Sequence, residues 1–318
     1  MLKDSRIFVA GADTMIGSAL VRELRRQGYQ HVVDARPNLT DRTEVESFFA
    51  AEQPEYVFMA AGRSGGIAAN QKYPADLMLD NLLAQNHVIT AAHNQRVARM
   101  LFLASSCSYP RDAPQPMQTS SLFTGPVEPT NEGYAVAKLS GITLCKAFRQ
   151  QYGDRFIAGI PANSFGPEDD FSPEDSHVVS ALMLKMYEAK TAGRPSVEIW
   201  GSGAARREFI FVDDLANACI FVMNHYEGAD PINIGSGDDV SIRELATLIR
   251  EVADYGGDLE FDTRKPDGMP LKSLDSTVLQ ELGWRPQTTL RAGLAITYDW
   301  FLTHQAERTR SLELAHVR

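Results

Sequence analysis

The chain has 318 residues, of which 44% are hydrophobic and 23% are charged. This composition suits one large or two modest globular domains, and it excludes a disordered chain, a collagen-like repeat and a coiled coil. Lys and Arg total 31 against 41 Asp and Glu, and the formal net charge of −10 argues against general binding of nucleic acid or anionic membrane. Any anionic ligand therefore needs a local basic cluster.

No apolar run approaches the roughly 20 residues of a membrane helix. Residues 7–10 are apolar, but Asp13 follows closely, so a buried strand fits this segment better than a signal peptide. The cysteines Cys107, Cys145 and Cys219 are far apart and have neither a metal-ligand spacing nor an even number for disulfides. We therefore expect a reduced, cytoplasmic protein with no metal site and no membrane segment.

Apolar segments of strand length alternate with helical patterns in the first half of the chain. The predicted strands are 6–10, 31–33, 56–61, 100–104 and 156–160, and the predicted helices are 15–27, 76–93 and 131–152. Continuous apolar strands that alternate with helices predict a parallel sheet covered on both faces. The expected fold class is therefore α/β, with a Rossmann-type doubly wound parallel sheet.

The pattern changes after Gly166, where the polar, acidic loop 167–176 begins and the later segments are less regular. Turn-forming residues occur at 201–203, 235–237 and 265–268. We predict a nucleotide-binding domain at 1–165 and a smaller C-terminal α/β substrate domain at 166–318, with some strands or helices crossing the boundary.

A glycine turn, Gly11 to Gly17, lies between the first predicted strand and the first predicted helix. Such a turn brings backbone N–H groups and a helix N-terminus to a pyrophosphate. Thr14 stands where a middle glycine would allow close approach of the backbone to phosphate. The sequence leaves open whether Thr14 contacts the pyrophosphate, and a tight turn with no ligand is the alternative.

Residues after the second predicted strand should decide the cofactor. Asp34 would accept hydrogen bonds from ribose hydroxyls and repel a 2′-phosphate, whereas Arg36 could pair with that phosphate. Asp41 is a candidate for the adenine edge, or for the cap of a following helix. The two readings of the cofactor, NADP(H) and NAD(H), both stay open at this point.

Ser105 ends a predicted strand, and Tyr134 and Lys138 follow on a predicted helix as Tyr-x-x-x-Lys. A spacing of four places the phenol and the ammonium on one helix face. A lysine charge beside a phenol is expected to lower the phenol pKa, and a serine hydroxyl opposite can polarise a carbonyl. These three residues are therefore candidate catalytic groups.

Taken together, the motifs resemble those of the extended short-chain dehydrogenase/reductases that act on nucleotide sugars, and more narrowly the GDP-L-fucose synthase family of bifunctional 3,5-epimerase/4-reductases. The similarity extends to about Phe301. The segments that carry it are 64–70, 105–110, 128–138, 161–167, 176–178, 200–203, 207–209 and 265–268.

The resemblance implies an acid/base pair for epimerisation, formed by Cys107 and His177. A C4 ketone acidifies the protons on C3 and C5, so a thiolate can remove one and an imidazolium on the other face can return one. Without the resemblance, a lone cysteine after a strand is more often a small buried hydrophobe, and a lone histidine in a polar loop is more often solvated.

The resemblance also assigns residues to two ligands. The implied GDP-sugar positions are Asn163, Lys185, Trp200, Arg207 and Lys272. The implied cofactor positions are Gly11, Asp13, Thr14, Met15, Ile16, Gly17, Asp34, Arg36, Asn38, Leu39, Asp41, Ala60, Ala61, Tyr134, Lys138, Pro161, Asn163, Ser164 and His177. Asn81 either braces the catalytic lysine through water or is an ordinary helix-surface residue.

The implied activity is 3,5-epimerisation of GDP-4-keto-6-deoxy-D-mannose, followed by NAD(P)H-dependent reduction at C4 in a homodimer. A bacterial member of the family has arginine near the positions of Asp13 and Asp34, so these acidic residues make NAD(H) possible, while Arg36 favours NADP(H). The alternatives are another nucleotide-sugar epimerase/reductase or an epimerase with tightly held NAD, and a non-catalytic dinucleotide sensor. A sensor tends to lose the tyrosine or the lysine, and both are present.

Overall fold

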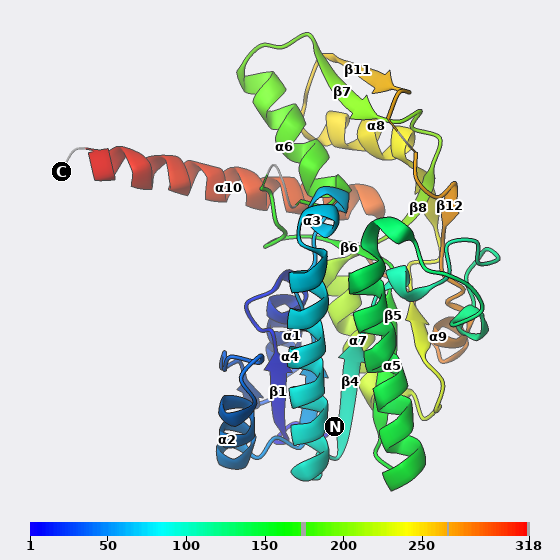
Figure 1. Ribbon diagram of the computed structural model, residues 1–318. Helices are drawn as coiled ribbons and strands as arrows, with labels where there is room; N and C mark the ends of the chain where they lie inside the picture. The colour runs from blue at the N-terminus through cyan, green and yellow to red at the C-terminus, as the bar shows by residue number, and fades with distance from the viewer. Residues whose placement is uncertain (173–175, 266, 317–318) are drawn as a thin grey trace.

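The computed structural model describes residues 1–172, 176–265 and 267–316 (Figure 1). Three parts of the sequence features named above lie outside the described residues. They are residues 173–175 of the acidic loop, Pro266 of the 265–268 turn, and residues 317–318 at the end of the second predicted domain.

A parallel six-stranded sheet, in the order β2-β1-β3-β4-β5-β9, forms the centre of the larger region. Its strands are β1 Arg6–Ala10, β2 His31–Val33, β3 Tyr56–Met59, β4 Arg99–Leu103, β5 Phe156–Pro161 and β9 Ile232–Ile234. The chain passes from β1 to β2 on one side and then to β3 on the other. Ligands of such sheets bind in the crevice where the order reverses, outside the carboxyl ends of the strands.

Helices cover this sheet. They are α1 Met15–Arg26, α2 Arg42–Glu52, α3 Ile67–Lys72, α4 Pro74–Asn94, α5 Glu132–Tyr152 and α7 Val212–His225, with short 3₁₀ turns η1 Ser106–Ser108, η2 Thr119–Ser121 and η3 Pro129–Asn131. Helix α4 packs against α2 and α5, and α1 packs against α7. Figure 1 shows α4 and α5 side by side in front of the sheet. The predicted doubly wound α/β fold is confirmed.

The remaining elements form a smaller α/β region. They are β6 Asn163–Phe165, α6 Val178–Thr191, β7 Ser196–Trp200, β8 Arg206–Phe211, β10 Asp239–Ser241, α8 Ile242–Val252, β11 Asp258–Asp262, β12 Leu271–Lys272, α9 Thr277–Glu281 and α10 Leu290–His316. Strand β8 pairs with β6, β10 and β12, and β7 pairs with β11. Helix α10 extends away from the body in Figure 1. Among the described residues, no helix is both long and apolar enough to cross a bilayer.

Two clusters of buried side chains hold the molecule together. The first surrounds the six-stranded sheet and includes Phe8, Phe58 and Phe102. The second includes Phe165 and Phe301 and lies under β8, α6, α8 and α10. Buried residues of α7 and β9 belong to the first cluster, so chain from beyond residue 165 packs against the six-stranded sheet. Strands β5 and β6 lead from one cluster to the other, which places the site residues between them.

Candidate active site

The glycine turn is built around two positions that exclude a side chain. Gly11 has φ +86°, and a Cβ there would lie 2.6 Å from the Ala61 Cα. A Cβ on Gly17 would lie 1.8 Å from the Gly11 carbonyl oxygen. The turn therefore brings the start of α1 against the residues after β3, in the crevice that the sheet order defines.

Thr14 has a structural task in this turn. Its hydroxyl accepts a hydrogen bond from the Gly17 amide at 3.0 Å and donates one to the Gly11 carbonyl at 2.8 Å. Thr14 is thus the N-cap of α1, whose first turn contains no acidic residue. Met15 and Ile16 are half-buried against the first cluster, and Asp13 is exposed. The helix N-terminus, with its partial positive charge, is left open to an anion.

The residues after β2 are exposed, and one of them forms an ion pair. Arg25 of α1 contacts the Asp34 carboxylate at 3.0 Å. Arg36 makes no ion pair with any residue that the structure describes. Asp41 is the N-cap of α2 and accepts from the Thr43 and Glu44 amides at 2.8 and 3.1 Å. Of the two roles open for Asp41, the structure shows the capping role.

Three further cofactor candidates, Asn38, Leu39 and Ala60, come after β2 or β3 in the chain. The Asn38 side chain accepts from the Thr40 amide at 3.1 Å, and the Leu39 carbonyl contacts the His87 ring at 3.1 Å. The Ala60 amide donates to Ala10 at 3.0 Å, which carries the β1–β3 pairing to the edge of the crevice.

Ser105, Tyr134 and Lys138 lie together where β4 meets the start of α5. Ser105 and Tyr134 share a side-chain hydrogen bond, and the Lys138 ammonium lies 5.9 Å from the centroid of the Tyr134 ring. Lys138 is buried and donates to the Leu103 carbonyl at 3.2 Å, and burial lowers its pKa to about 8.

The pKa of Tyr134 differs from the sequence-based expectation. We expected the lysine charge to lower it, but burial and the charge on Cys107 raise it, against a smaller opposing effect of the Ser105 hydrogen bond. The phenol is therefore protonated at neutral pH. The physical reason is that desolvation of the phenolate outweighs every favourable contact that this structure offers it.

Asn81 lies next to the buried lysine. Its amide nitrogen donates to the Arg63 and Leu77 carbonyls at 2.8 and 2.7 Å, but its carbonyl oxygen is buried without a partner among the described residues. A Cβ on Gly62, with φ +149°, would lie 2.6 Å from this oxygen and 2.9 Å from the Lys138 nitrogen. Both polar atoms therefore lie close to the Gly62 backbone.

Cys107 follows Ser105 in the turn after β4. The Lys272 ammonium of β12 donates to its sulfur at 3.3 Å. Burial raises the thiol pKa, but the charge of Lys272 and hydrogen bonds from Ser105, Lys272 and Asn131 outweigh it, so the pKa of Cys107 is lowered overall. A lowered pKa is the mark of a reactive cysteine.

His177 is the N-cap residue of α6, and its residue surface is exposed. Desolvation by the surrounding protein lowers its pKa, the Asp170 carboxylate opposes this, and the Lys272 ammonium lowers it further. Lys272 therefore acts electrostatically on both members of the expected acid/base pair.

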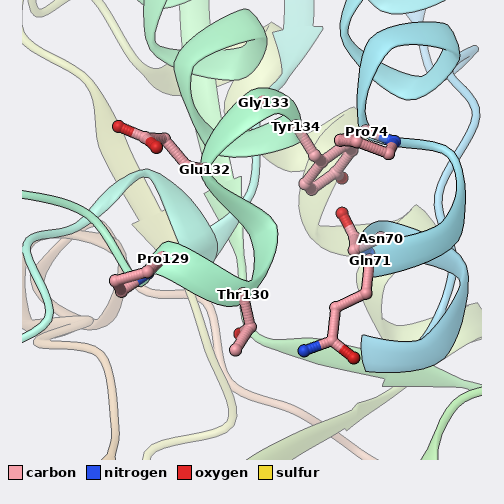
Figure 2. A pocket seen from close by; sticks show the side chains of 8 residues that line it. All are labelled: Asn70, Gln71, Pro74, Pro129, Thr130, Glu132, Gly133 and Tyr134. Atoms are coloured by element: carbon pink, nitrogen blue, oxygen red, sulfur yellow. The ribbon is translucent and has the colours of Figure 1, made fainter.

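Tyr134 also lines a cavity of about 540 Å³. Figure 2 shows its lining residues on η3 and the first turn of α5, and on α3 and the start of α4 facing them. They are Asn70, Gln71, Pro74, Pro129, Thr130, Glu132, Gly133 and Tyr134. The helix that carries the phenol therefore begins at the wall of an accessible hollow.

The four residues expected to contact GDP lie on α6, β7, β8 and β12. Trp200 is 58% exposed, and the ammonium groups of Lys185 and Lys265 lie 5.8 and 5.0 Å from its ring centroid. Arg207 lies opposite Lys272 in the β8–β12 pairing and donates to the Met269 carbonyl at 2.6 Å. Two lysines therefore flank the Trp200 ring, and Arg207 and Lys272 lie side by side on neighbouring strands.

Asn163 and Ser164 are half-buried on β6, and Pro161 ends β5. The Asn163 amide donates to the Glu208 carbonyl at 2.8 Å, which ties β6 to β8. The described residues contain no group of three or more His, Cys, Asp or Glu side chains that could hold a metal ion.

Two polar residues, Asn131 and Glu208, were not predicted from the sequence as candidates. Asn131 bonds the Cys107 sulfur, and its own side-chain oxygen is buried without a partner among the described residues. Glu208 is 1% exposed and accepts from the Leu274 and Gly237 amides at 2.7 and 2.9 Å. Asn131 lies within the quoted segment 128–138 and could have been found there. Glu208 had no local signal beyond its place beside Arg207.

A fold of this kind, with a glycine turn at the sheet crossover and a serine, tyrosine and lysine beside it, defines a class of dinucleotide-binding enzymes. The chain belongs to the NAD dependent epimerase/dehydratase family, whose model matches residues 7–235.

Individual relatives are similar over nearly the whole chain. GDP-L-fucose synthase 1 of Arabidopsis thaliana is 50% identical over 309 residues, covering 96% of each chain. GDP-L-fucose synthase of Escherichia coli is 45% identical over 316 residues, covering 96% of this chain and 98% of the relative. The resemblance stated from the motifs is therefore confirmed.

Solved structures agree with this placement. A GDP-6-OMe-4-keto-L-xylo-heptose reductase from C. jejuni has a TM-score of 0.90 and 32% identity, covering 96% of this chain and 99% of that chain. A GDP-L-fucose synthetase from Naegleria fowleri bound to NADP has a TM-score of 0.89 and 25% identity, covering 96% of each chain.

Proposed function

We propose that the protein is a GDP-L-fucose synthase that epimerises GDP-4-keto-6-deoxy-D-mannose at C3 and C5 and reduces it at C4 with a nicotinamide cofactor. The observation that carries this proposal is the thiol of Cys107, which lies 3.3 Å from an ammonium group and beside the Ser105 and Tyr134 pair. A simple reductase needs no such thiol. The names of relatives at 45 and 50% identity support the same activity.

The residues present fit a dinucleotide. A Cβ at Gly11 or Gly17 would overlap other atoms of the protein, so the two glycines let the turn pack tightly and hold the N-terminus of α1 beside the end of β1, where a pyrophosphate could meet its N–H groups. When bound, a reduced nicotinamide supplies the hydride for C4. Lys138 would hold the ribose hydroxyls, and Pro161, Asn163, Ser164 and His177 would enclose the nicotinamide end.

Of the two cofactors, we favour NADP(H) over NAD(H). Asp34 would repel a 2′-phosphate, but its charge is already paired with Arg25 at 3.0 Å. The exposed guanidinium of Arg36 is available on the same loop to pair with a phosphate. Asp13, at the other acidic position, is exposed and can turn toward solvent.

The sugar nucleotide would lie between the two clusters of buried side chains. Trp200 offers an exposed ring for the guanine, and Lys185, Arg207 and Lys272 would pair with the diphosphate. With the diphosphate fixed on β8 and β12, the sugar would extend toward Ser105, Cys107 and Tyr134.

The side chains then divide the chemistry. Cys107, as thiolate, would remove the proton that the C4 ketone acidifies on C3 and C5, and His177 would exchange the proton on the opposite face. Ser105 would hold the C4 oxygen by a hydrogen bond. Tyr134 carries its proton at neutral pH because its pKa is raised, and it would give that proton to the alkoxide formed at C4.

Deuterium exchange tests the proposal. The protein is incubated with the keto sugar in deuterium oxide, with and without NADPH, and the sugar is examined by NMR. We expect label at C3 and C5 without NADPH, and GDP-L-fucose with it. The variant C107S should lose the label, whereas Y134F should keep it and lose reduction by about 100-fold or more. Reduction with no label at either carbon would show a plain 4-reductase, the activity named for the heptose-sugar relative.

We further propose a homodimer and a cytoplasmic location. The dimer would form through α4 and α5, on whose outer faces Leu79 and Val136 are 56 and 37% exposed. The cytoplasm would keep the proposed thiol base reduced.

A further inference from the structure

The sulfur of Cys107 is held by donors from separate parts of the chain. Lys272 donates from β12, 165 residues away in sequence, at 3.3 Å. Asn131, in η3 before α5, bonds the same sulfur, as does Ser105 two residues before it. An anionic sulfur is a much stronger acceptor than a neutral thiol, so an arrangement of converging donors favours the thiolate.

The position of Lys272 is fixed by the fold. Strand β12 pairs with β8, with Lys272 opposite Arg207. Two residues further on, the Leu274 amide donates to the buried Glu208 carboxylate at 2.7 Å. The ammonium is itself half-buried, which strengthens its attraction to a nearby anion relative to an exposed lysine.

Other charged groups face this sulfur or its lysine. Arg207 lies on the strand beside Lys272. Burial lowers the pKa of Arg207, and a negative charge on Cys107 opposes this effect, so the two groups lie near each other. Tyr134 on α5 shares the Ser105 hydroxyl with the sulfur, and His177 at the start of α6 is repelled by Lys272. Within the part of the chain that the structure describes, Lys272 and Arg207 are thus the cations near Cys107, and Lys272 is the one that donates to its sulfur.

We propose that Lys272 is a positioning residue that keeps Cys107 as a thiolate in the resting enzyme. The inference rests on the proposed function, because it assumes that Cys107 is the base. This role is additional to the proposed diphosphate contact, since the same ammonium group would bind the nucleotide and stabilise the thiolate of Cys107. The thiolate is ready before a sugar enters, and Cys107 requires no separate base to remove its proton.

The test is the pH dependence of iodoacetamide alkylation at Cys107 in the full chain, measured by mass spectrometry of the digested protein. Removal of the charge in K272M should raise the pH midpoint by about 1 to 3 units and slow alkylation at pH 7 by about tenfold or more. The variant K272R keeps a cation and should restore most of the wild-type midpoint. Cys145 and Cys219, whose pKa values burial raises, serve as slow internal references.

The matched control is K190M, which removes a lysine whose ammonium bonds Ala253 and Asp254 instead. It should leave the Cys107 midpoint unchanged. Equal midpoints in wild type and in a K272M protein that retains its circular dichroism spectrum would overturn the proposal. So would a K272R protein that behaves like K272M, because charge would then not be the cause.

Deuterium exchange provides a second readout. In K272M, the pH below which the rate of deuterium exchange falls should rise together with the alkylation midpoint. If Lys272 only bound the nucleotide, its replacement would raise KM and leave that pH unchanged. Alkylation needs no substrate, so the two hypotheses fail separately. A wild-type protein that exchanges no deuterium removes the proposed function, and unchanged alkylation midpoints remove only the role of Lys272.

Discussion

The Asp34 carboxylate forms an ion pair with Arg25 at 3.0 Å, and this contact changes how the carboxylate can act on the ribose end of a bound nucleotide. An acidic residue after the second strand usually selects a ribose hydroxyl and repels a 2′-phosphate. An exposed ion pair contributes only about 0 to 1 kcal/mol, so a phosphate could displace the carboxylate from Arg25 at little cost. Arg25 and Arg36 would then share the phosphate.

Replacement of Arg36 tests this balance. In R36A we expect the Kd for NADPH to rise by about ten- to a hundredfold, because a hydrogen bond to a charged group contributes about 1.5 to 3 kcal/mol. The Kd for NADH should stay within about twofold. Fluorescence titration of both nucleotides measures the two constants. R42A, on a neighbouring exposed arginine that pairs with Glu46, is the control and should change neither. If wild type already binds NADH far more tightly, the cofactor assignment is wrong.

At the level of elements, the strands and the longer helices of the first half of the chain could be predicted, whereas α2 and α3 and much of the second half could not. Strand β5 is buried at every residue and β1 at all but its first, so their continuous apolar runs are visible in the sequence. Strand β11 has no fully buried residue, β6 and β10 have three residues each, and β12 has two. Short strands whose pairing partners are distant in sequence leave no periodic signal.

The same reasoning applies to the candidate site. Tyr134 and Lys138 share a helix, so their spacing alone places them together. The contact between Cys107 and Lys272 joins residues 165 positions apart, and only the completed β8–β12 pairing creates it. The pKa of Tyr134 could not be predicted for a related reason, since it depends on how much solvent the assembled walls exclude.

The loop that leads into α6 contains a buried carboxyl group. One oxygen of Asp169 accepts from the Asp170 amide at 2.8 Å, and the other is buried without a partner among the described residues. Burial raises its pKa from 3.8 to about 7, against a weaker opposing effect of the hydrogen bond from the Asp170 amide. In the folded protein the carboxyl is therefore mostly protonated only below about pH 7.

This raised pKa predicts the sign of a pH effect on stability. The contribution of protonated Asp169 is fully present below about pH 4 and is lost as the pH rises through about 7. The variant D169N cannot ionise at this position. As the pH rises from about 4 to about 7, the free energy of unfolding of D169N should therefore increase relative to that of wild type by about 1 to 3 kcal/mol. This range follows from ~1.4 kcal/mol for each pKa unit, reduced for the partial exposure of the residue. Urea unfolding at pH 5 and 8 measures it. D238N, at an exposed site, should show no such trend, and a constant difference between D169N and wild type would contradict the assignment.

The whole molecule places its candidate site where two separately packed regions meet. The dinucleotide turn and the Ser105 group belong to the sheet region, while Lys185, Arg207 and Lys272 belong to the region built around β8. The two sets come together through β5 and β6, and through α7 and β9, which return to the first cluster. Catalysis as proposed therefore depends on the relative position of both regions, and α5 is the element that carries Tyr134 while packing against α4.

That helix pair also determines the expected assembly. Helices α4 and α5 have 21 residues each and are joined by Gln85, whose amide donates to the Ala137 carbonyl at 2.7 Å and to Ser140 at 2.8 Å. This contact buries one face of each helix. On the outer face of the pair, Leu79 of α4 is 56% exposed, and this face could pack against a second copy of the pair. Two such pairs would form a four-helix bundle.

Sedimentation velocity should therefore show twice the chain mass for wild type, and L79D should shift the protein toward the monomer, because a charge in an apolar helix interface loses its hydration without gaining a partner. V278D is the matched control, since Val278 is 51% exposed on α9, outside the proposed interface, and its variant should stay dimeric. In monomeric L79D, the rate of reduction should fall clearly while the melting temperature changes little, because Tyr134 lies on α5, a helix that the second copy would no longer support. A wild-type protein that sediments as a monomer, or an L79D protein that remains a dimer, would exclude the α4–α5 interface.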